Sequence, residues 1–499
     1  MAPAEFGADP FTLGVASGDP LDDAVILWTR LDPAVGLPEG DIEVAWEVAN
    51  DPDMTDIVAS GTGMAVAALG HSVHVDAVGL VPDAMFHFRF SVGGFESTVG
   101  RTRTFVSAGT MPDRFRFAFS SCQNWEQGYY VAYRDLVEQE DLDAFMFLGD
   151  YIYEYASGGY ADPRSRITGQ DFECETVDHY RERYTLYRSD PLLQAAHAQV
   201  PWIITWDDHE VDNDYAGGVS ENNDDPATFG DRRAAAYQVW YEFMPVRLEP
   251  PSGPDFAIHR AFAYGDLVRF HVLDTRQYRS DQQQGEPFIA QIEQVQVRDD
   301  AVQFAAEHTM LGSQQYAWLV DGVATSDAVW DVLAQQVFMF GGNAVADSDP
   351  PIIVIDTWDG YAGERQRLLE TIGVGADGGA DNLIVLTGDF HSAAVGELRS
   401  DPFDQTLPVV GVEFMSSSIS SSFFDGDVAI SGLIDAALSA NPQLRFFDSR
   451  RGYTLCEVTP QKWVSTYRAV ADQFDETSAV ETIATWSVAA GTTAVEQVG

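Results

Sequence analysis

Six side chains that can bind metals or transfer protons stand where apolar stretches of the chain give way to polar loops. The clearest case is Asp150, which follows the apolar run 144–148 and Gly149, with Tyr153 three residues further on. The six residues are Cys122, Asp150, Asp208, His209, Asp389 and His391. If the apolar stretches are parallel strands, their carboxyl ends lie along one sheet edge, where α/β proteins place their ligands. The pattern therefore predicts one shared site.

The residue types at these positions indicate a metal centre. Several carboxylates at one sheet edge would repel one another strongly unless cations neutralised them. The thiolate of Cys122 and the phenolate of Tyr153 suit ferric iron or another transition ion, whereas bare carboxylates suit calcium, magnesium or manganese. Two neighbouring metal ions would activate water and bind a phosphoryl group between them.

Each of these residues also has a purely structural interpretation. Asp150 can start a turn or cap a helix, Cys122 can be a small buried hydrophobic residue, and Tyr153 can serve packing alone. The recurrence of the pattern at several strand ends favours the metal ligands. Arg276 and Arg279 follow another apolar run, and they can either clamp a phosphate or pair with nearby acids. The sequence leaves these two alternatives open.

The segments that carry these residues alternate between strand-like and helical stretches, which predicts an α/β fold with a parallel sheet. The predicted strands are 115–120, 143–148, 201–206, 267–273, 329–338 and 382–387, and the predicted helices include 130–138 and 177–187. Residues 113–499 are therefore expected to form the catalytic domain.

The first part of the chain has a different character. Short strand-like segments separated by turn residues occupy 42–48, 71–78, 85–92 and 102–106. Such spacing predicts an all-β sandwich of the immunoglobulin or fibronectin type. We expect this N-terminal domain to cover residues 1–108, with a linker before residue 113.

Charge is the most unusual property of the composition. The 499 residues include 78 Asp and Glu against 28 Lys and Arg, for a formal net charge of −50. Such a surface repels nucleic acids and anionic membranes, and it resembles proteins adapted to concentrated salt. No apolar run approaches the roughly 18 residues of a membrane-spanning helix. Three cysteines are too few, and odd in number, for a disulfide framework.

Five motifs resemble those of one known family in both their order and their residues. Ser-Cys-Gln, Gly-Asp-Tyr-Ile-Tyr-Glu, Trp-Asp-Asp-His-Glu, Leu-Asp-Thr-Arg-Gln-Tyr-Arg and Gly-Asp-Phe-His are similar to those of PhoD-type alkaline phosphatases and phosphodiesterases. The resemblance covers nearly the whole chain, including the opening Val-Ala-Ser-Gly-Asp-Pro. It implies a two-sheet αββα core related to metallophosphoesterases and purple acid phosphatases, with an iron(III) and calcium centre.

The resemblance also implies roles for individual residues. Cys122, Asp150, Tyr153 and His391 would hold one metal, and Asp150 would bridge to a second. Asp208 and Asp389 would bind that second ion, with Asn213 or Asp207 completing its shell; calcium is expected there, with magnesium, manganese or zinc as alternatives. The resemblance makes His209 the group that assists the leaving oxygen. Arg276 is the further candidate catalytic residue.

The expected activity is hydrolysis of small phosphate mono- or diesters by a metal-activated hydroxide at a centre of two or more metals. The alternatives are a phospholipase D-like phosphodiesterase on the same centre and a non-enzymatic, calcium-binding surface protein. No stable membrane insertion is expected, and no nucleic-acid binding beyond hydrolysis of its phosphodiesters. The family resemblance implies twin-arginine export to a secreted or cell-surface location, although a cytoplasmic one stays open.

Overall fold

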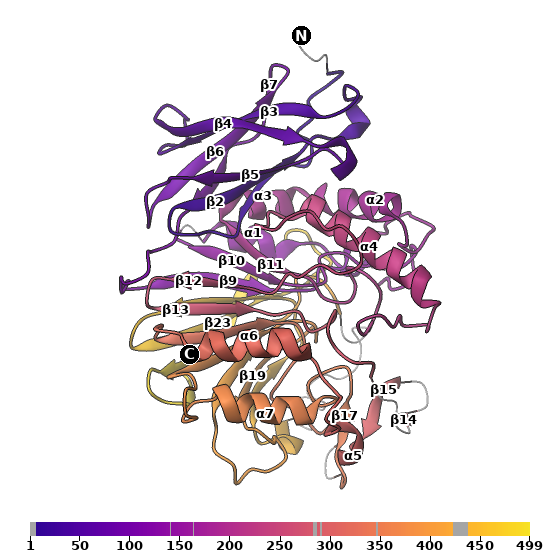
Figure 1. Cartoon of the computed structure of the whole chain (residues 1–499), viewed down its shortest axis with the longest axis vertical. Coiled ribbons are helices and arrows are strands. Elements are labelled where there is room, and N and C mark those ends of the chain that lie inside the picture. The colour runs from indigo at the N-terminus through magenta and orange to yellow at the C-terminus, as the bar shows by residue number, and fades with distance from the viewer. Residues whose placement is uncertain are drawn as a thin grey trace.

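The structure is a computed structural model that describes residues 6–499 except 140, 163, 283–286, 290–291, 346–347 and 423–437. Figure 1 shows the N-terminal strands at one end, a broad middle layer of strands and helices, and helices α6 and α7 on the opposite outer side. The mixed α/β class predicted from the sequence is confirmed. Within the described residues, no helix combines the length and apolar character that a membrane crossing needs.

The first sheet has ten strands in the order β25-β24-β23-β22-β9-β10-β11-β1-β2-β5. Its centre is the parallel set β9 (Phe115–Ser120), β10 (Ala144–Leu148) and β11 (Trp202–Thr205). Every residue of β10 and β11 is buried. Such continuous apolar runs are typical of parallel strands that are covered on both faces, which is why the sequence located these three strands correctly.

The second sheet has seven strands in the order β12-β13-β16-β18-β20-β19-β21. Four of them run parallel: β13 (Val268–Val272), β16 (Trp330–Gln335), β18 (Leu383–Thr387) and β20 (Gly411–Met415). The predicted strand 329–338 is shorter than expected, because the chain leaves the sheet after Gln335.

Three of the apolar cores among the described residues hold the two sheets and their helices together. Phe117, Met146, Val332 and Leu386 belong to one core, which therefore lies between the two sheets. A second core covers the other face of the first sheet with helices α1 to α4, and a third covers the second sheet with α6 and α7. The predicted helices are confirmed as α1 (Val131–Val137) and α2 (Val177–Arg188).

The N-terminal strands form two packed layers, but one layer continues into the first sheet. Strand β1 (Val15–Gly18) pairs in parallel with β11, and β2 (Ala24–Arg30) and β5 (Ser72–Val78) follow it. All residues of β1 and β2 are buried, because one face packs on β3 and β6 and the other on the helical side. The sequence analysis expected a self-contained sandwich and did not foresee this shared sheet.

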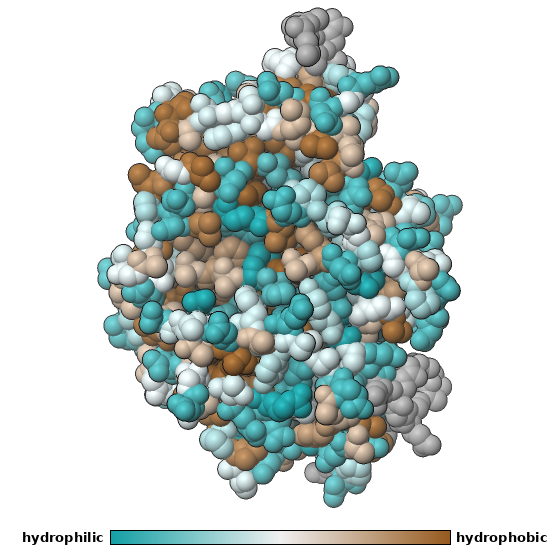
Figure 2. All heavy atoms as spheres, viewed as in Figure 1, coloured by the Kyte–Doolittle hydropathy of each residue, from teal (hydrophilic) through white to brown (hydrophobic). Residues whose placement is uncertain are grey.

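Other details of this region also differ from expectation. Strand β4 (Ile57–Ala65) was not predicted, and its exposed, Gly- and Ser-containing sequence explains why. The last predicted strand, 102–106, is instead β8 (Gly100–Arg103). On the face shown in Figure 2, hydrophilic residues cover much of the surface, and several hydrophobic patches gather over the N-terminal strands at the top.

The remaining elements complete the layers. They are β3 (Ile42–Ala49), β6 (Met85–Val92), β7 (Phe95–Glu96), α3 (Pro191–Gln199), α4 (Pro226–Phe243), β12 (Arg260–Tyr264), β14 (Pro287–Ile289), β15 (Ile292–Val297), α5 (Asp300–Gln303), α6 (Gly312–Ala324), β17 (Ile352–Val354), α7 (Ala362–Ile372), β19 (Ala393–Leu398), β21 (Leu444–Asp448), β22 (Gly452–Val458), β23 (Lys462–Val470), β24 (Val480–Ala489) and β25 (Val495–Gln497), with short 3-10 turns at Pro33–Val35, Ala67–Leu69 and Trp125–Gln127.

Candidate metal centre

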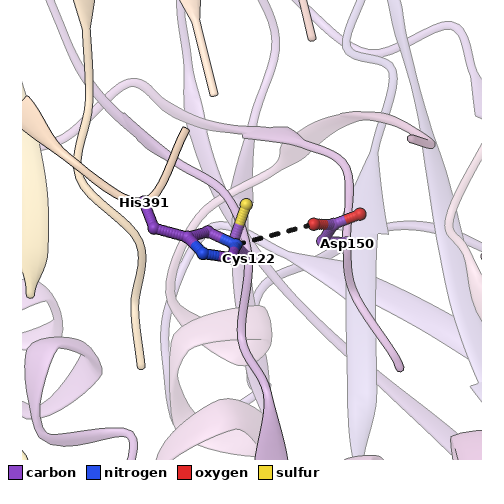
Figure 3. A group of neighbouring side chains, drawn as sticks. All are labelled: Cys122, Asp150 and His391. Carbon is purple, nitrogen blue, oxygen red and sulfur yellow. Dashed lines mark ion pairs between the residues drawn. The ribbon is translucent and has the colours of Figure 1, made fainter. Parts of the chain in front are cut away.

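Cys122, Asp150 and His391 meet at the carboxyl ends of β9, β10 and β18, and Figure 3 shows their side chains converging. Their potential ligand atoms all lie within 4.8 Å of one another, and all three residues are buried. The imidazole Nε2 of His391 lies 4.0 Å from Oδ2 of Asp150. Three strand ends that are distant in sequence therefore present a thiol, an imidazole and a carboxylate to one point.

Tyr153 completes this cluster. Its phenolic oxygen lies 3.0 Å from Oδ2 of Asp150 and 3.0 Å from Nε2 of His391. Burial, the first cause, and the nearby charge of Asp150 raise the pKa of Tyr153 well above its ordinary value. Burial lowers the pKa of His391 to about 3, and that keeps the imidazole neutral, the form that binds a metal.

A strained backbone aims these side chains. Cys122, Asp150, Asp389 and His391 all have φ between 50° and 59°, in the left-handed region that non-glycine residues seldom adopt. Such strain is typical of functional sites, where the surrounding structure enforces it. Gly149, with φ of 100°, has no room for a Cβ because the backbone of Asp207 lies against it. The glycine before Asp150 is therefore required by close packing of two strand ends.

Glu210 holds the ends of β10 and β11 together. Its buried carboxylate accepts hydrogen bonds from the backbone N–H groups of Asp150, Tyr151 and Asp207, at 3.0, 2.6 and 2.8 Å. These bonds place Asp150 beside the Asp207–Asp208 pair. Burial raises the pKa of Glu210 to about 7, although the three donors oppose the shift. Glu210 thus positions the candidate ligands rather than joining them.

A second group of carboxylates surrounds Arg276, which follows β13 and is completely buried. Asp207, Asp208 and Asp389 have carboxylate oxygens within 4.8 Å of one another. The guanidinium lies 3.3 Å from Asp208 and 3.1 Å from Asp389, and it also contacts Asp207. Arg276 therefore pairs with local acids, which was one of the two alternatives left open by the sequence.

Asp356 also belongs to this group, although it was not predicted from the sequence. It follows the short strand β17, and its carboxylate pairs with both Arg276 and Arg279, at 2.8 and 2.7 Å. Strand β17 has only three residues and belongs to a small separate sheet. The sequence therefore has no long apolar run before Asp356 that would mark it as a residue at a strand end. Arg279, like Arg276, therefore forms an ion pair with a neighbouring carboxylate.

The carboxylates exceed the cations available to neutralise them. Burial, followed by neighbouring acids, raises the pKa of Asp150, Asp207 and Asp389 well above the ordinary value, although His209 or Arg276 opposes the shift in each case. Oδ1 of Asp150 and Oδ2 of Asp207 are buried without a hydrogen-bond partner. Buried acceptors of this kind are costly unless a cation or a donor satisfies them. The donor set therefore fits bound metal ions.

Asn213 is not brought into either cluster. Its amide donates to Oε1 of Glu221 at 2.8 Å, and its backbone N–H donates to Glu154. The residue lines the same cavity as Asp208 and Asp389. Its role as a metal ligand stays a prediction.

His209 has a buried carboxylate partner that the sequence analysis did not assign. Oε2 of Glu154 lies 2.8 Å from Nδ1 of His209, and Glu154 is fully buried. Burial lowers the pKa of His209, but the charges of Glu154, Asp150 and Asp208 outweigh it, and the pKa lies well above its ordinary value. Glu154 is the last residue of the Gly-Asp-Tyr-Ile-Tyr-Glu motif, so its position in that motif could have indicated a role in the site.

These residues line a cavity of about 530 Å³. Its walls include Asp150, Asp208, Asp389 and His391 together with His209, and its aromatic lining residues are Tyr155, Tyr160 and Phe390. The size suits a small organic molecule. The candidate ligands Asp150, Asp208, Asp389 and His391 therefore face a cavity that a substrate can occupy.

Comparison with known proteins agrees with this geometry. Residues 117–467 match the family described as PhoD-like phosphatase, and residues 1–106 match the PhoD-like phosphatase N-terminal domain. The chain is 41% identical over 491 residues to alkaline phosphatase D of Bacillus subtilis (strain 168), covering 97% of this chain and 82% of the relative.

A solved structure described as that of PhoD superposes with a TM-score of 0.91 at 40% identity, covering 99% of this chain and 93% of the other. The family named from the motifs is thus confirmed, and so is the predicted class of enzyme, a phosphoric ester hydrolase. The chain belongs to the PhoD-like phosphatase family.

Proposed function

We propose that this chain hydrolyses phosphate mono- and diesters at a centre of at least two metal ions, iron(III) and calcium. Cys122, Asp150, Tyr153 and His391 would hold the iron. Asp208 and Asp389 would hold the calcium, and Asp150, whose carboxylate lies near Asp208 as well as near Cys122 and His391, would contribute to both sites. The observation that carries the proposal is the convergence of a thiol, a phenol, an imidazole and a carboxylate, with the Tyr153 oxygen 3.0 Å from both Asp150 and His391.

The two donor sets differ in kind, which supports two different metals. Thiolate and phenolate donors favour a transition ion such as iron(III). Carboxylate oxygens alone, as in the Asp207, Asp208 and Asp389 group, favour a hard ion such as calcium. When bound, the ions would polarise the phosphoryl oxygens and make a water molecule more acidic.

The chain's own residues would supply the remaining chemistry. Because Glu154 engages Nδ1 of His209, Nε2 is the nitrogen that can reach a substrate. A protonated His209 would donate to the leaving oxygen, and Glu154 would hold the ring in position. Arg276 would balance part of the negative charge of Asp207, Asp208, Asp356 and Asp389 and so keep these acids in one place.

We also infer the type of fold that each of the two domains has, from the way their layers pack. The two sheets with helices on both outer faces fit the αββα core of metallophosphoesterases, within residues 113–499. The two N-terminal layers fit an immunoglobulin-like sandwich within residues 1–108. Adaptation to concentrated salt, supported by the net charge of −50, and export from the cytoplasm, implied by the family, are part of the same proposal.

The test combines metal content, colour and activity of the purified protein. We expect iron and calcium by elemental analysis, a visible absorption band from thiolate and phenolate ligands, and hydrolysis of both p-nitrophenyl phosphate and bis(p-nitrophenyl) phosphate. The ratio of the two rates separates a phosphatase from a phospholipase D-like diesterase. An active, colourless protein that contains only calcium or magnesium would overturn the iron site, and a protein that hydrolyses neither ester would overturn the activity.

A further inference from the structure

One wall of the cavity is aromatic and lies directly beside His209. Tyr155 and Tyr160 both line the cavity. The ring of Tyr155 meets the imidazole edge to face with 5.4 Å between centroids, and that of Tyr160 lies nearly parallel to it at 6.4 Å. The two tyrosine rings contact each other at 5.9 Å. We call Tyr155 and Tyr160 the aromatic wall.

The aromatic wall is held in place by a buried carboxylate. Glu126, which is 5% exposed, accepts hydrogen bonds from Ser157, Gly158 and Thr168, in the loop that carries both tyrosines. Tyr160 is fixed at both ends: its carbonyl accepts from Asn124 at 3.2 Å, and its hydroxyl donates to the Ser422 carbonyl at 3.0 Å. A surface ordered before binding costs little entropy when a ligand packs on it.

Much of the rest of the cavity is acidic, although the apolar side chains of Val354 and Phe390 also line it. Asp150, Asp208, Asp214, Asp356 and Asp389 all contribute to its lining. An organic group with its own negative charge would be repelled there, even after metal ions neutralise part of the charge. The aromatic wall therefore offers an uncharged organic group a contact surface directly beside His209.

The position of His209 indicates which part of the substrate meets this wall. In hydrolysis a water oxygen bonds to phosphorus and the ester P–O bond breaks. The leaving oxygen takes a proton from Nε2 of His209 and departs as a neutral alcohol, and the imidazole is reprotonated by the proton that the attacking water gives up. The leaving group must therefore lie beside His209, within reach of the aromatic wall.

We propose that the aromatic wall is a leaving-group subsite that selects phosphate esters whose alcohol carries an uncharged aromatic ring. Because both tyrosine rings lie beside His209, at centroid distances of 5.4 and 6.4 Å, we expect this ring to be attached to the ester oxygen directly or through one carbon. A nucleobase, which a ribose separates from its phosphate, would lie too far away. This inference rests on the proposed phosphate ester hydrolysis and adds the substrate class to it.

The test compares benzyl phosphate with ethyl phosphate, because the two leaving alcohols have similar acidity and differ in the ring. We expect the wild-type protein to prefer benzyl phosphate by about ten-fold in kcat/KM. Cyclohexylmethyl phosphate, which has similar bulk without aromaticity, should fall between the two. Tyr155→Leu and Tyr160→Leu should each lower the preference about three- to ten-fold, the usual value of one aromatic contact.

The tyrosine-to-phenylalanine variants distinguish the contribution of the aromatic ring to selectivity from that of its hydroxyl. Tyr155→Phe and Tyr160→Phe should keep the benzyl preference within about two-fold, because the ring contact is retained. Hydrolysis of ethyl phosphate by each variant shows that the centre is intact, so a general folding defect would lower both rates and leave the ratio unchanged.

Three outcomes would overturn the subsite. The first is a wild-type ratio near one, and the second is a ratio that both leucine variants leave unaltered while they still hydrolyse ethyl phosphate at the wild-type rate. Faster hydrolysis of thymidine 5′-phosphate than of benzyl phosphate would also overturn it. A wild-type protein that hydrolyses none of these esters would refute the proposed function itself, which is a different result from the loss of selectivity.

Discussion

Glu154 and His209 form a buried ion pair, with Oε2 of the carboxylate 2.8 Å from Nδ1 of the imidazole. The two residues are 55 positions apart in the chain. Glu154 also accepts the backbone N–H of Asn213 through its other oxygen, at 2.9 Å. The carboxylate therefore fixes both the ring orientation of His209 and the start of the loop that follows it.

Removing this carboxylate should weaken catalysis and shift its pH dependence. Glu154 raises the pKa of His209, so the protonated form persists to higher pH when Glu154 is present. Glu154→Gln should lower kcat about ten- to hundred-fold, and it should move the alkaline limb of the kcat–pH profile to lower pH. Steady-state rates between pH 6 and 11 measure both effects.

Glu221→Gln provides the matched control. Glu221 is a nearby acid, but its carboxylate accepts a hydrogen bond from Asn213 rather than from His209, and its backbone N–H donates to Asp212. This variant removes the same charge and should change kcat less than about three-fold. Equal losses in the two variants would contradict a specific role for Glu154.

The hydrogen bond from Ser421 to Tyr153 should be visible in the spectrum of the iron-loaded protein. Oγ of Ser421 donates to the phenolic oxygen at 2.7 Å, and such a bond withdraws electron density from a phenolate ligand. Tyr153→Phe should abolish most of the visible band, and Ser421→Ala should shift it to longer wavelength. An unchanged spectrum in Tyr153→Phe would mean that Tyr153 is not a ligand.

Arg276 should be important for stability when metals are absent. It is completely buried among carboxylates, and removing one member of a buried charge cluster typically costs about 3–5 kcal/mol. Arg276→Met should lower the free energy of unfolding by about that amount in chelator-treated protein, as measured by denaturant titration. Calcium should recover part of the loss.

Arg450→Met is the control for that experiment. Arg450 pairs with Asp448 and Glu481, and its side chain is 45% exposed. Exposed ion pairs contribute about 0–1 kcal/mol, so this variant should be nearly neutral although it removes the same charge. A similar effect of the two substitutions would show that net charge, rather than the buried cluster, decides stability.

Glu413 should make the stability of the protein depend on pH. It is fully buried on β20 and accepts bonds from Thr387 and from the backbone N–H groups of Met339 and Phe340. Burial raises its pKa from 4.5 to about 7. The folded state therefore binds this proton more firmly than the unfolded state does, and the stabilising contribution present below pH 4.5 is lost as the pH rises through 7.

The shift corresponds to about 3 kcal/mol at most between pH 4.5 and 8. Relative to the wild type, Glu413→Gln should become more stable as the pH rises, because glutamine does not titrate. Denaturant unfolding of both proteins at pH 5 and pH 8 tests this. A constant difference between them at the two pH values would contradict the raised pKa.

Much of the candidate site could be predicted from the sequence. Buried parallel strands appear as continuous apolar runs. The ends of β9, β10, β11 and β18 could therefore be located from the positions of these runs in the sequence. The motifs at those strand ends then identified the PhoD-like family. Cys122, Asp150, Tyr153 and His391 were assigned as one group, and the structure brings their side chains together.

Only the tertiary structure decided how the loops meet. The partnership of Glu154 with His209, the position of Asp356 and the acid pairing of Arg276 depend on contacts between segments far apart in sequence. Left-handed backbone at Cys122 and Asp150 aims their side chains, and no local propensity predicts it for a cysteine. The shared sheet formed by β1 and β11 likewise follows from packing on both faces, which a short strand does not reveal by itself.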